Sequence, residues 1–373
     1  MTRRHRTFSA AMGRGSFLPA LLIVGVGATA LIASSSPPAQ PDGSAQALLR
    51  QKMGFSTAEV QALDAGHAVI RTLETPVRQE IAHVGAVYID APPERLLERF
   101  RDIERFERGP GVPQIGHFGS TPQVEDLASL TLPAADVKAL AACRPGACDL
   151  QLPAAAIDRY RNEVRWTSPD AARQATQITR EVLVALARAY QANGNGALGY
   201  YDDDESGPFP VAEHFRALLT SRDDFPAAVP GLMAYLDTYP YGRPEGAEEF
   251  LYWSVVAFGL KPTIRVNHVV IYPLPGAQPV AYAIAIKQLY ASHYFHTTLE
   301  LRFAIDDDRP GRGFWLVSLT RSRNDGMTGL KGLFLRSIIS RRSGEAVRKY
   351  LAHVRQQVER PTLADGRVER SGS

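Results

Sequence analysis

The sequence contains few features that mark a specific chemistry. It has two cysteines in 373 residues, and the G-x-S-x-G, H-E-x-x-H and phosphate-loop patterns are absent. These absences exclude a zinc site built from two cysteine pairs, as well as the local signatures of common hydrolases and nucleotide-binding enzymes. The sequence therefore indicates no catalytic residue, no metal site and no cofactor.

An excess of charge of one sign is also missing. The 42 Lys and Arg residues are nearly balanced by 39 Asp and Glu residues, and part of the net charge of +3 lies at Arg3, Arg4, Arg6 and Arg14. The rest of the chain has no broad basic field of the kind that attracts nucleic acid, so we expect no nucleic-acid partner. Hydrophobic residues at 45% and charged residues at 22% are typical of a globular protein with a sizeable core.

The segment "FLPALLIVGVGATALIA", residues 17–33, is strongly apolar and uncharged, and it follows the basic start "MTRRHRTF". This pattern is typical of an export signal or of a short membrane anchor. Cleavage and anchoring both stay open, because the run is short for a membrane span and its Ala-x-Ala sites are poorly placed. We expect a signal peptide or anchor over 1–33, a flexible tether over 34–47, and export to the periplasm or cell envelope, with inner-membrane association if the anchor is kept.

The two cysteines, Cys143 and Cys148, flank a Pro-Gly turn in "CRPGACD". In an oxidising compartment this spacing predicts a disulfide that closes a tight loop. The alternatives are a redox pair, which usually has two intervening residues, and half of a metal site, for which no second cysteine pair exists.

The N-terminal third predicts alternating helices and strands. Ser56 and Glu59 form a capping-box pattern that starts a helix. Strands are expected over 67–74 and 80–91, the second apolar on both faces and therefore central. Pro92 and Pro93 begin a helix that continues to Phe106.

The remainder divides by composition. Residues 113–248 are rich in alanine and predict a helical insertion packed against the sheet, whereas the chain after Glu249 is rich in β-branched and aromatic residues. Strands are expected over 250–258, 263–272 and 313–323, with one continuous strand over 280–305. A long helix follows over 328–359, bent at Gly344, and then a disordered tail over 361–373.

This order of elements resembles the START-like superfamily, also called SRPBCC or helix-grip. The stretches that carry the resemblance are "GAVYIDAPPERLLERFRDIERF" and "RSRNDGMTGLKGLFLRSIISRRSGEAVRKYLAHVRQQVE". The resemblance implies an α+β fold in which a curved antiparallel sheet wraps a long C-terminal helix around a hydrophobic cavity. The START-like domain would comprise 48–112 and 249–360, interrupted by the helical insertion.

His293 and His296 raise the question of a metal site. In a strand, residues three apart point to opposite faces, and His296 and Glu300 would lie roughly 13 Å apart at ~3.3 Å per residue. We therefore expect no metal site here. The face of His293 is apolar and that of His296 is polar, so His293 is expected to point inward and His296 outward.

His268 and His293 both project from apolar strand faces, which they share with Tyr272 and Phe295 respectively. Each histidine is either a core residue with a protein partner or a hydrogen-bonding group for the polar end of a ligand. Arg321 either pairs with an anionic head group or lies at a solvated strand end.

For function, the resemblance implies an exported protein that binds a lipid or another hydrophobic small molecule. One alternative is an enzyme of the cyclase or dehydratase type, with His268 or His293 as the general base. Another is a cell-envelope module whose insertion binds a partner protein. Fold alone does not choose among these functions.

Overall fold

The computed structural model describes residues 44–203, 207–220, 229–274, 280–309, 311–324 and 329–360. The expected signal or anchor over 1–33, most of the expected tether and the expected tail over 361–373 lie outside these residues. Among the helices that are described, none is both long and apolar enough to cross a membrane.

The described chain begins with two short helices. α1 (Ala45–Gln51) is capped by the Ser44 hydroxyl and has Ala45 and Leu49 fully buried, so the tether expected over 34–47 is wrong for its last three residues. α2 (Thr57–Asp64) starts with the predicted capping box, in which Ser56 accepts from the Glu59 N–H and Glu59 accepts from the Ser56 N–H.

Eight of the described strands form one antiparallel sheet in the order β1-β2-β10-β9-β8-β7-β6-β3. The predicted α+β class is therefore confirmed. β2 is flanked on both sides and buried at all ten positions, as its apolar sequence predicts. The bounds of the strands are β1 (Val69–Leu73), β2 (Glu80–Ile89), β3 (Gln114–His117), β6 (Glu248–Val256), β7 (Thr263–Pro273), β8 (Val280–Ala291), β9 (Phe295–Asp306) and β10 (Phe314–Asn324).

The single strand expected over 280–305 is wrong, because the chain reverses inside it. β8 ends at Ala291 and β9 begins at Phe295, and the two strands pair antiparallel, with Lys287 opposite Leu299. The turn holds Tyr294 at a φ of 63° and contains neither glycine nor proline. Without glycine or proline, the local sequence does not signal this hairpin strongly.

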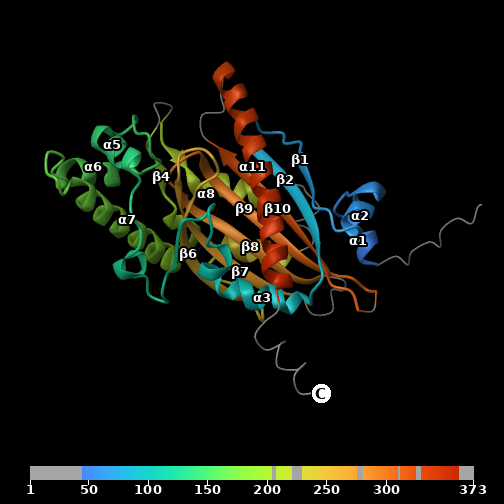
Figure 1. Cartoon of the computed structure of the whole chain (residues 1–373). Coiled ribbons are helices and arrows are strands. Elements are labelled where there is room, and N and C mark those ends of the chain that lie inside the picture. The colour runs from blue at the N-terminus through green and yellow to red at the C-terminus, as the bar shows by residue number, and fades with distance from the viewer. Residues whose placement is uncertain are drawn as a thin grey trace, which may run out of the picture. The chain divides into compact units, whose positions relative to one another are not determined.

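One face of the sheet, which we call the α11-side face, is covered by α11 (Gly329–Glu359), α3 (Pro93–Arg101) and α4 (Ile103–Glu107). α11 crosses β2 and β1 with α3 beside its C-terminal part (Figure 1). The helix expected over 92–106 is divided at Asp102, whose side chain caps α4. The apolar core on this face includes Val87, Leu316, Ile286, Leu351, Val354 and Val358.

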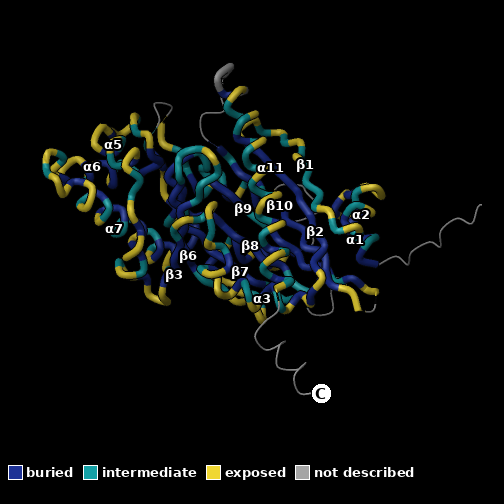
Figure 2. Tube along the Cα trace, viewed as in Figure 1, coloured by how far each residue is buried: buried dark blue, intermediate teal, exposed yellow. Residues whose placement is uncertain are grey.

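The opposite face, which we call the insertion-side face, is covered mainly by helices of residues 113–248. Tyr190 of α7 and Tyr235 of α10 contact strand residues, and α8 packs on β9 and β10. The region is largely helical as predicted, except that β3 joins the edge of the main sheet beside β6. The strands and the inner helix surfaces form the buried interior (Figure 2). The helices are η1 (Val124–Leu127), α5 (Ala134–Ala142), α6 (Ala154–Glu163), α7 (Ala171–Asn193), η2 (Gly194–Ala197), α8 (Val211–Leu219) and α10 (Pro230–Thr238), and β4 (Tyr200–Tyr201) pairs with β5 (Phe209–Pro210).

The predicted disulfide is confirmed. Cys143 and Cys148 are joined, and Gly146 between them has a φ of 76°, which only glycine adopts readily. The Gly146 N–H donates to the carbonyl of Asp202, so the loop is also attached to the chain near β4.

The packing of α11 on the sheet predicts a cost for any side chain at Gly85. A Cβ there would lie 2.8 Å from Leu351 Cδ1 and 3.0 Å from Val347 Cγ1. Gly85→Val should therefore lower the free energy of unfolding by about 1–3 kcal/mol, measured by urea denaturation. Gly196→Val is the control, because a Cβ at Gly196 meets nothing within 4 Å. Equal losses in the two variants would contradict this packing.

Candidate functional site

The strand register places His268 and Arg321 in one row across the insertion-side face. Arg321 is opposite Leu299, Leu299 is opposite Lys287, and Lys287 is opposite His268. The row therefore aligns two of the predicted ligand residues three strand spacings apart, roughly 14 Å at ~4.8 Å per spacing, with Lys287 next to His268.

His268 is a buried residue whose two ring nitrogens both have protein partners. Nδ1 lies 2.9 Å from the Tyr190 hydroxyl, and Nε2 lies 3.3 Å from a carboxylate oxygen of Glu249. Glu249 also accepts a 2.5 Å hydrogen bond from the Tyr235 hydroxyl. Burial lowers the pKa of His268, although Glu249 opposes that shift. A neutral imidazole that donates from Nε2 and accepts at Nδ1 satisfies this arrangement.

Lys287 is fully buried, at 0% exposure, beside this histidine. Its Nζ donates to Asn195 Oδ1 and lies 3.4 Å from the carbonyl of Leu236, both in the insertion. The centroids of the Phe215 and Tyr190 rings are 4.1 and 4.9 Å from Nζ. Burial holds the pKa of Lys287 well below its usual value, and Asp237 offsets only part of that shift. Lys287 and His268 thus attach the helical insertion to the sheet through polar contacts.

Arg321 is buried and forms an ion pair with Glu80, which Arg323 also approaches at 3.6 Å. The alternative of a solvated strand end is therefore wrong. The charge of Arg321 is compensated by the Glu80 carboxylate of the same chain.

The other predicted residues lie elsewhere. His293 is in the β8–β9 turn, where Nε2 lies 3.1 Å from Oδ1 of the buried Asp136, so its inward orientation is confirmed. The outward orientation expected for His296 is wrong, because its half-buried ring lies 3.8 Å from that of Phe209 in the insertion. Tyr272 is half-buried at the end of β7, and Phe295 packs on the α11-side face. The five predicted residues therefore do not form one site.

A second polar cluster, which the sequence reasoning missed, lies on the α11-side face. Asn267 is opposite Tyr252 on one side and Gln288 on the other, and Thr298 is opposite Ser322 on the neighbouring strands. Asn267 has 0% exposure, and neither its Oδ1 nor its Nδ2 has a hydrogen-bond partner in the described part of the chain. The same holds for Gln288 Oε1 and Thr298 Oγ1. Because buried polar groups are nearly always hydrogen-bonded, these unpartnered atoms set the row apart from an ordinary buried strand face.

A chain of ion pairs borders this row. Glu300 accepts hydrogen bonds from Arg265 Nη2 at 3.1 Å and from Arg302 Nη2 at 2.8 Å. Arg302 Nη1 lies 3.8 Å from a carboxylate oxygen of Glu107. Burial raises the pKa of Glu300, but the two arginines outweigh it and hold that pKa below its usual value. Burial raises the pKa of Glu107 by more than the charge of Arg302 lowers it, so that pKa lies above its usual value.

Apolar side chains lie next to the same row. Gln288 Nε2 donates to the carbonyl of Phe295, and Ser322 is opposite Ile81. These neighbours belong to a small cluster between the sheet and α11 that comprises Ile81, Ile339, Leu260, Tyr294, Phe295 and Leu335. We call the polar row, the ion pairs and these apolar residues together the Asn267 cluster.

The sequence does carry a signal for this cluster. Polar residues alternate with apolar ones at Arg265 and Asn267 in β7, at Thr298, Glu300 and Arg302 in β9, and at Ser318, Thr320 and Ser322 in β10. Such alternation is usual for a solvated sheet face, and only the covering helix makes it a buried polar layer.

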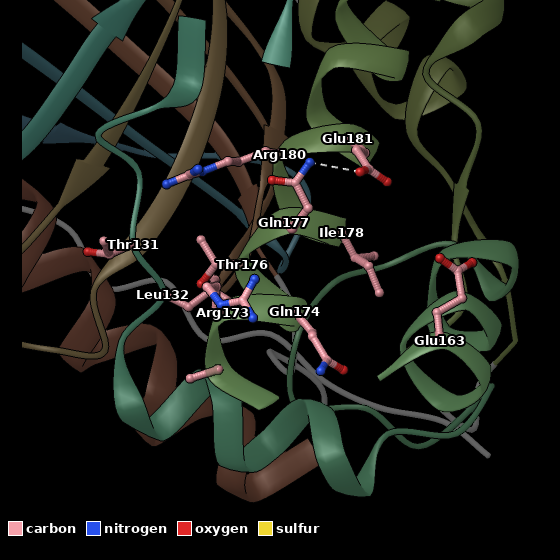
Figure 3. A pocket seen from close by; sticks show the side chains of 11 residues that line it. Thr131, Leu132, Glu163, Arg173, Gln174, Thr176, Gln177, Ile178, Arg180 and Glu181 are labelled. Atoms are coloured by element: carbon pink, nitrogen blue, oxygen red, sulfur yellow. Dashed lines mark hydrogen bonds between the residues drawn. The ribbon is translucent and has the colours of Figure 1, made fainter. Parts of the chain in front are cut away.

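A surface groove of about 750 Å³ lies on the helical insertion, along the first half of α7 (Figure 3). It is open to solvent and contains charges of both signs, including Arg173, Arg180, Glu163 and Glu181. None of the predicted site residues and no member of the Asn267 cluster lines it.

The comparisons with known proteins give no match: no family model, curated protein or solved structure corresponds to the chain. Within the described ranges, no group of three or more His, Cys, Asp or Glu side chains is arranged to hold a metal ion.

The His293–Asp136 pair predicts different costs for the two neighbouring histidines. His293→Ala leaves Asp136 buried without its partner and should lower the free energy of unfolding by about 3 kcal/mol. His296→Ala removes a ring contact at a half-buried position and should cost about 1 kcal/mol. Urea denaturation of both variants measures the difference, and a larger loss for His296→Ala would contradict the assigned orientations.

The burial of Lys287 predicts a pH-dependent effect of replacing it. Its folded-state pKa is lowered, so the unfolded chain binds an additional proton below the usual lysine pKa, and the folded protein gains stability as the pH rises. Lys287→Met removes this dependence. The free energy of unfolding of Lys287→Met minus that of wild type should therefore be larger at about pH 7 than at about pH 9. Lys349→Met, at an exposed position of α11, is the control. The same difference at both pH values for Lys287→Met would show that the amine is not desolvated.

Proposed function

We propose that the chain binds a small amphipathic, lipid-like molecule in the Asn267 cluster, between α11 and the sheet. The observation that carries the proposal is the row of unpartnered polar atoms at Asn267, Gln288 and Thr298 beside a patch of aromatic and aliphatic side chains. Ligand sites that are mostly apolar with a few convergent polar groups have this composition.

The location supports the same proposal. The START-like resemblance implies a ligand between the sheet and the C-terminal helix, and the Asn267 cluster lies on the face that α11 covers. Tyr350 and Ile339 of α11 contact the cluster directly, Tyr350 through the Arg302 guanidinium at 4.1 Å and Ile339 through Ile81.

The insertion-side residues support a ligand site less well. Both ring nitrogens of His268 and the Nε2 of His293 are engaged by protein groups, and Arg321 is paired with Glu80. A general base must reach a substrate proton, so this geometry gives no positive support for the alternative of a cyclase or dehydratase.

We also propose that the protein acts outside the cytoplasm, as its N-terminal sequence predicts. The Cys143–Cys148 disulfide supports this location, because such bonds persist mainly in oxidising compartments. Whether the N-terminus anchors the protein in the inner membrane stays a prediction from the sequence alone.

The proposal predicts that stability and binding respond in opposite directions at Asn267. In ligand-free protein, Asn267→Leu removes two unpartnered polar atoms and should leave stability unchanged or raise it by about 1 kcal/mol. Binding of the neutral fluorescent probe N-phenyl-1-naphthylamine, and retention of co-purifying molecules in native mass spectrometry, should fall by about tenfold because hydrogen bonds to the ligand are lost.

Asn195→Leu is the matched control on the other face. Asn195 is hydrogen-bonded to Lys287 and to the carbonyls of Leu236 and Asp237, so its replacement should lower stability and leave probe binding unchanged. If Asn267→Leu loses as much stability as this control and keeps its probe affinity, Asn267 has a structural role and the proposal is wrong.

A further inference from the structure

The unpartnered atoms of the Asn267 cluster are mainly donors. Arg302 Nε and Nη1, Arg265 Nε and Asn267 Nδ2 all lack a hydrogen-bond acceptor among the described residues, whereas the unpartnered atoms that only accept are Asn267 Oδ1 and Gln288 Oε1. The Thr298 hydroxyl can serve in either role. A molecule that satisfies this set must supply more acceptors than donors.

The charges of the cluster point in the same direction. Arg265 and Arg302 both donate to Glu300, so two guanidinium groups share one closely bonded carboxylate. The second carboxylate, Glu107, approaches Arg302 Nη1 only to 3.8 Å, which is too long for a hydrogen bond. Burial also raises the pKa of Glu107, which favours its neutral form. Two buried guanidinium groups thus share one closely hydrogen-bonded carboxylate, an arrangement that a further anionic acceptor would stabilise.

The arginines are also held in place. The Arg302 guanidinium lies 4.1 Å from the Tyr350 ring centroid and 5.5 Å from that of Phe100, and the Arg302 side chain is almost fully buried. Arg265 is two residues from Asn267 on the same strand, so both project from the same face of β7. A fixed guanidinium group beside an amide favours recognition of a small, acceptor-rich anion.

We infer that the polar end of the ligand is a carboxylate, which accepts from Arg302, Arg265 and Asn267 while its hydrocarbon part contacts Phe295 and its apolar neighbours. This inference rests on the proposed function and specifies its ligand class as a monoanionic, carboxylate-bearing amphiphile. A carboxylate supplies acceptors without donors, as the unpartnered donors of Arg302, Arg265 and Asn267 require.

The test compares molecules that share one chain and differ only in their polar group. Dodecanoate, dodecyl phosphate, dodecanol and dodecylamine, each below its micelle concentration, compete for N-phenyl-1-naphthylamine bound to the wild-type protein. Dodecanoate should displace the probe at a concentration about tenfold lower than dodecanol, and dodecylamine should be the weakest competitor. This ranking is measured on wild type, so it does not depend on any variant that folds poorly.

A variant pair then assigns the preference to the arginines. Arg265→Gln should abolish most of the advantage of dodecanoate over dodecanol, measured as the ratio of the two displacement concentrations. Arg101→Gln, which removes an exposed pair with Glu248 outside the cluster, should preserve the advantage.

The two proposals fail in different ways. If the probe binds and dodecanol competes as well as dodecanoate, the carboxylate inference is wrong and the proposed function stands. A clear preference for dodecyl phosphate also overturns the carboxylate assignment. If neither the probe nor any member of the series binds, the proposed function itself is wrong.

Discussion

Strands β7, β8 and β9 are buried on both faces, so consecutive residues along each of them enter two separate interiors. In β7, Asn267 projects to the α11-side face whereas the next residue, His268, projects to the insertion-side face, where it contacts Tyr190. A shift of one residue in any strand would exchange the two interiors, which makes the register the constraint on which the other features depend. The β8–β9 hairpin sets that register at the centre of the sheet.

The two interiors treat their polar groups differently. On the insertion-side face, His268, Lys287 and Arg321 have protein partners, and the first two bind groups on α7, η2 and α10. Such a satisfied network specifies how the insertion docks, since a displaced helix would leave these groups buried and unbonded. On the α11-side face, Asn267, Gln288 and two arginines keep several atoms without partners in neighbouring positions, whereas those of the insertion side, such as Asp136 Oδ2 and Trp315 Nε1, belong to separate contacts. The concentration of such atoms is what distinguishes the Asn267 cluster.

The buried polar groups also bear on stability. The lowered pKa values of Lys287 and His268 make the folded protein less stable as the pH falls below the usual pKa of each group, because the unfolded chain takes up protons more readily than the folded protein does. The close contact between Gly85 and α11 raises stability. It brings Leu351 and Val347 onto the sheet and excludes water from the apolar part of that face. The fold thus combines a tightly packed half of the α11-side face with a polar half that is incompletely satisfied.

The sequence by itself determined the elements whose cause is local. The Ser56 capping box, the apolar run of β2, the Cys143–Cys148 pair around a Pro-Gly turn and the alternation of β7 and β10 each depend on neighbours within a few residues.

The tertiary structure decided which residues meet. The hairpin at Ser292–Tyr294 contains neither glycine nor proline, and its formation places His293 in a turn instead of a strand. The sequence also showed that His268 lies on an apolar face, but not that α7 would supply Tyr190 as its partner. Polar alternation at Asn267, Thr298 and Glu300 was visible, yet only the long-range packing of α11 turned a face that resembles a solvated one into a buried layer. Local hydrogen bonding and side-chain periodicity act over a few residues, whereas burial depends on segments far apart in the chain, and that is why the fold class followed from the sequence and the candidate site did not.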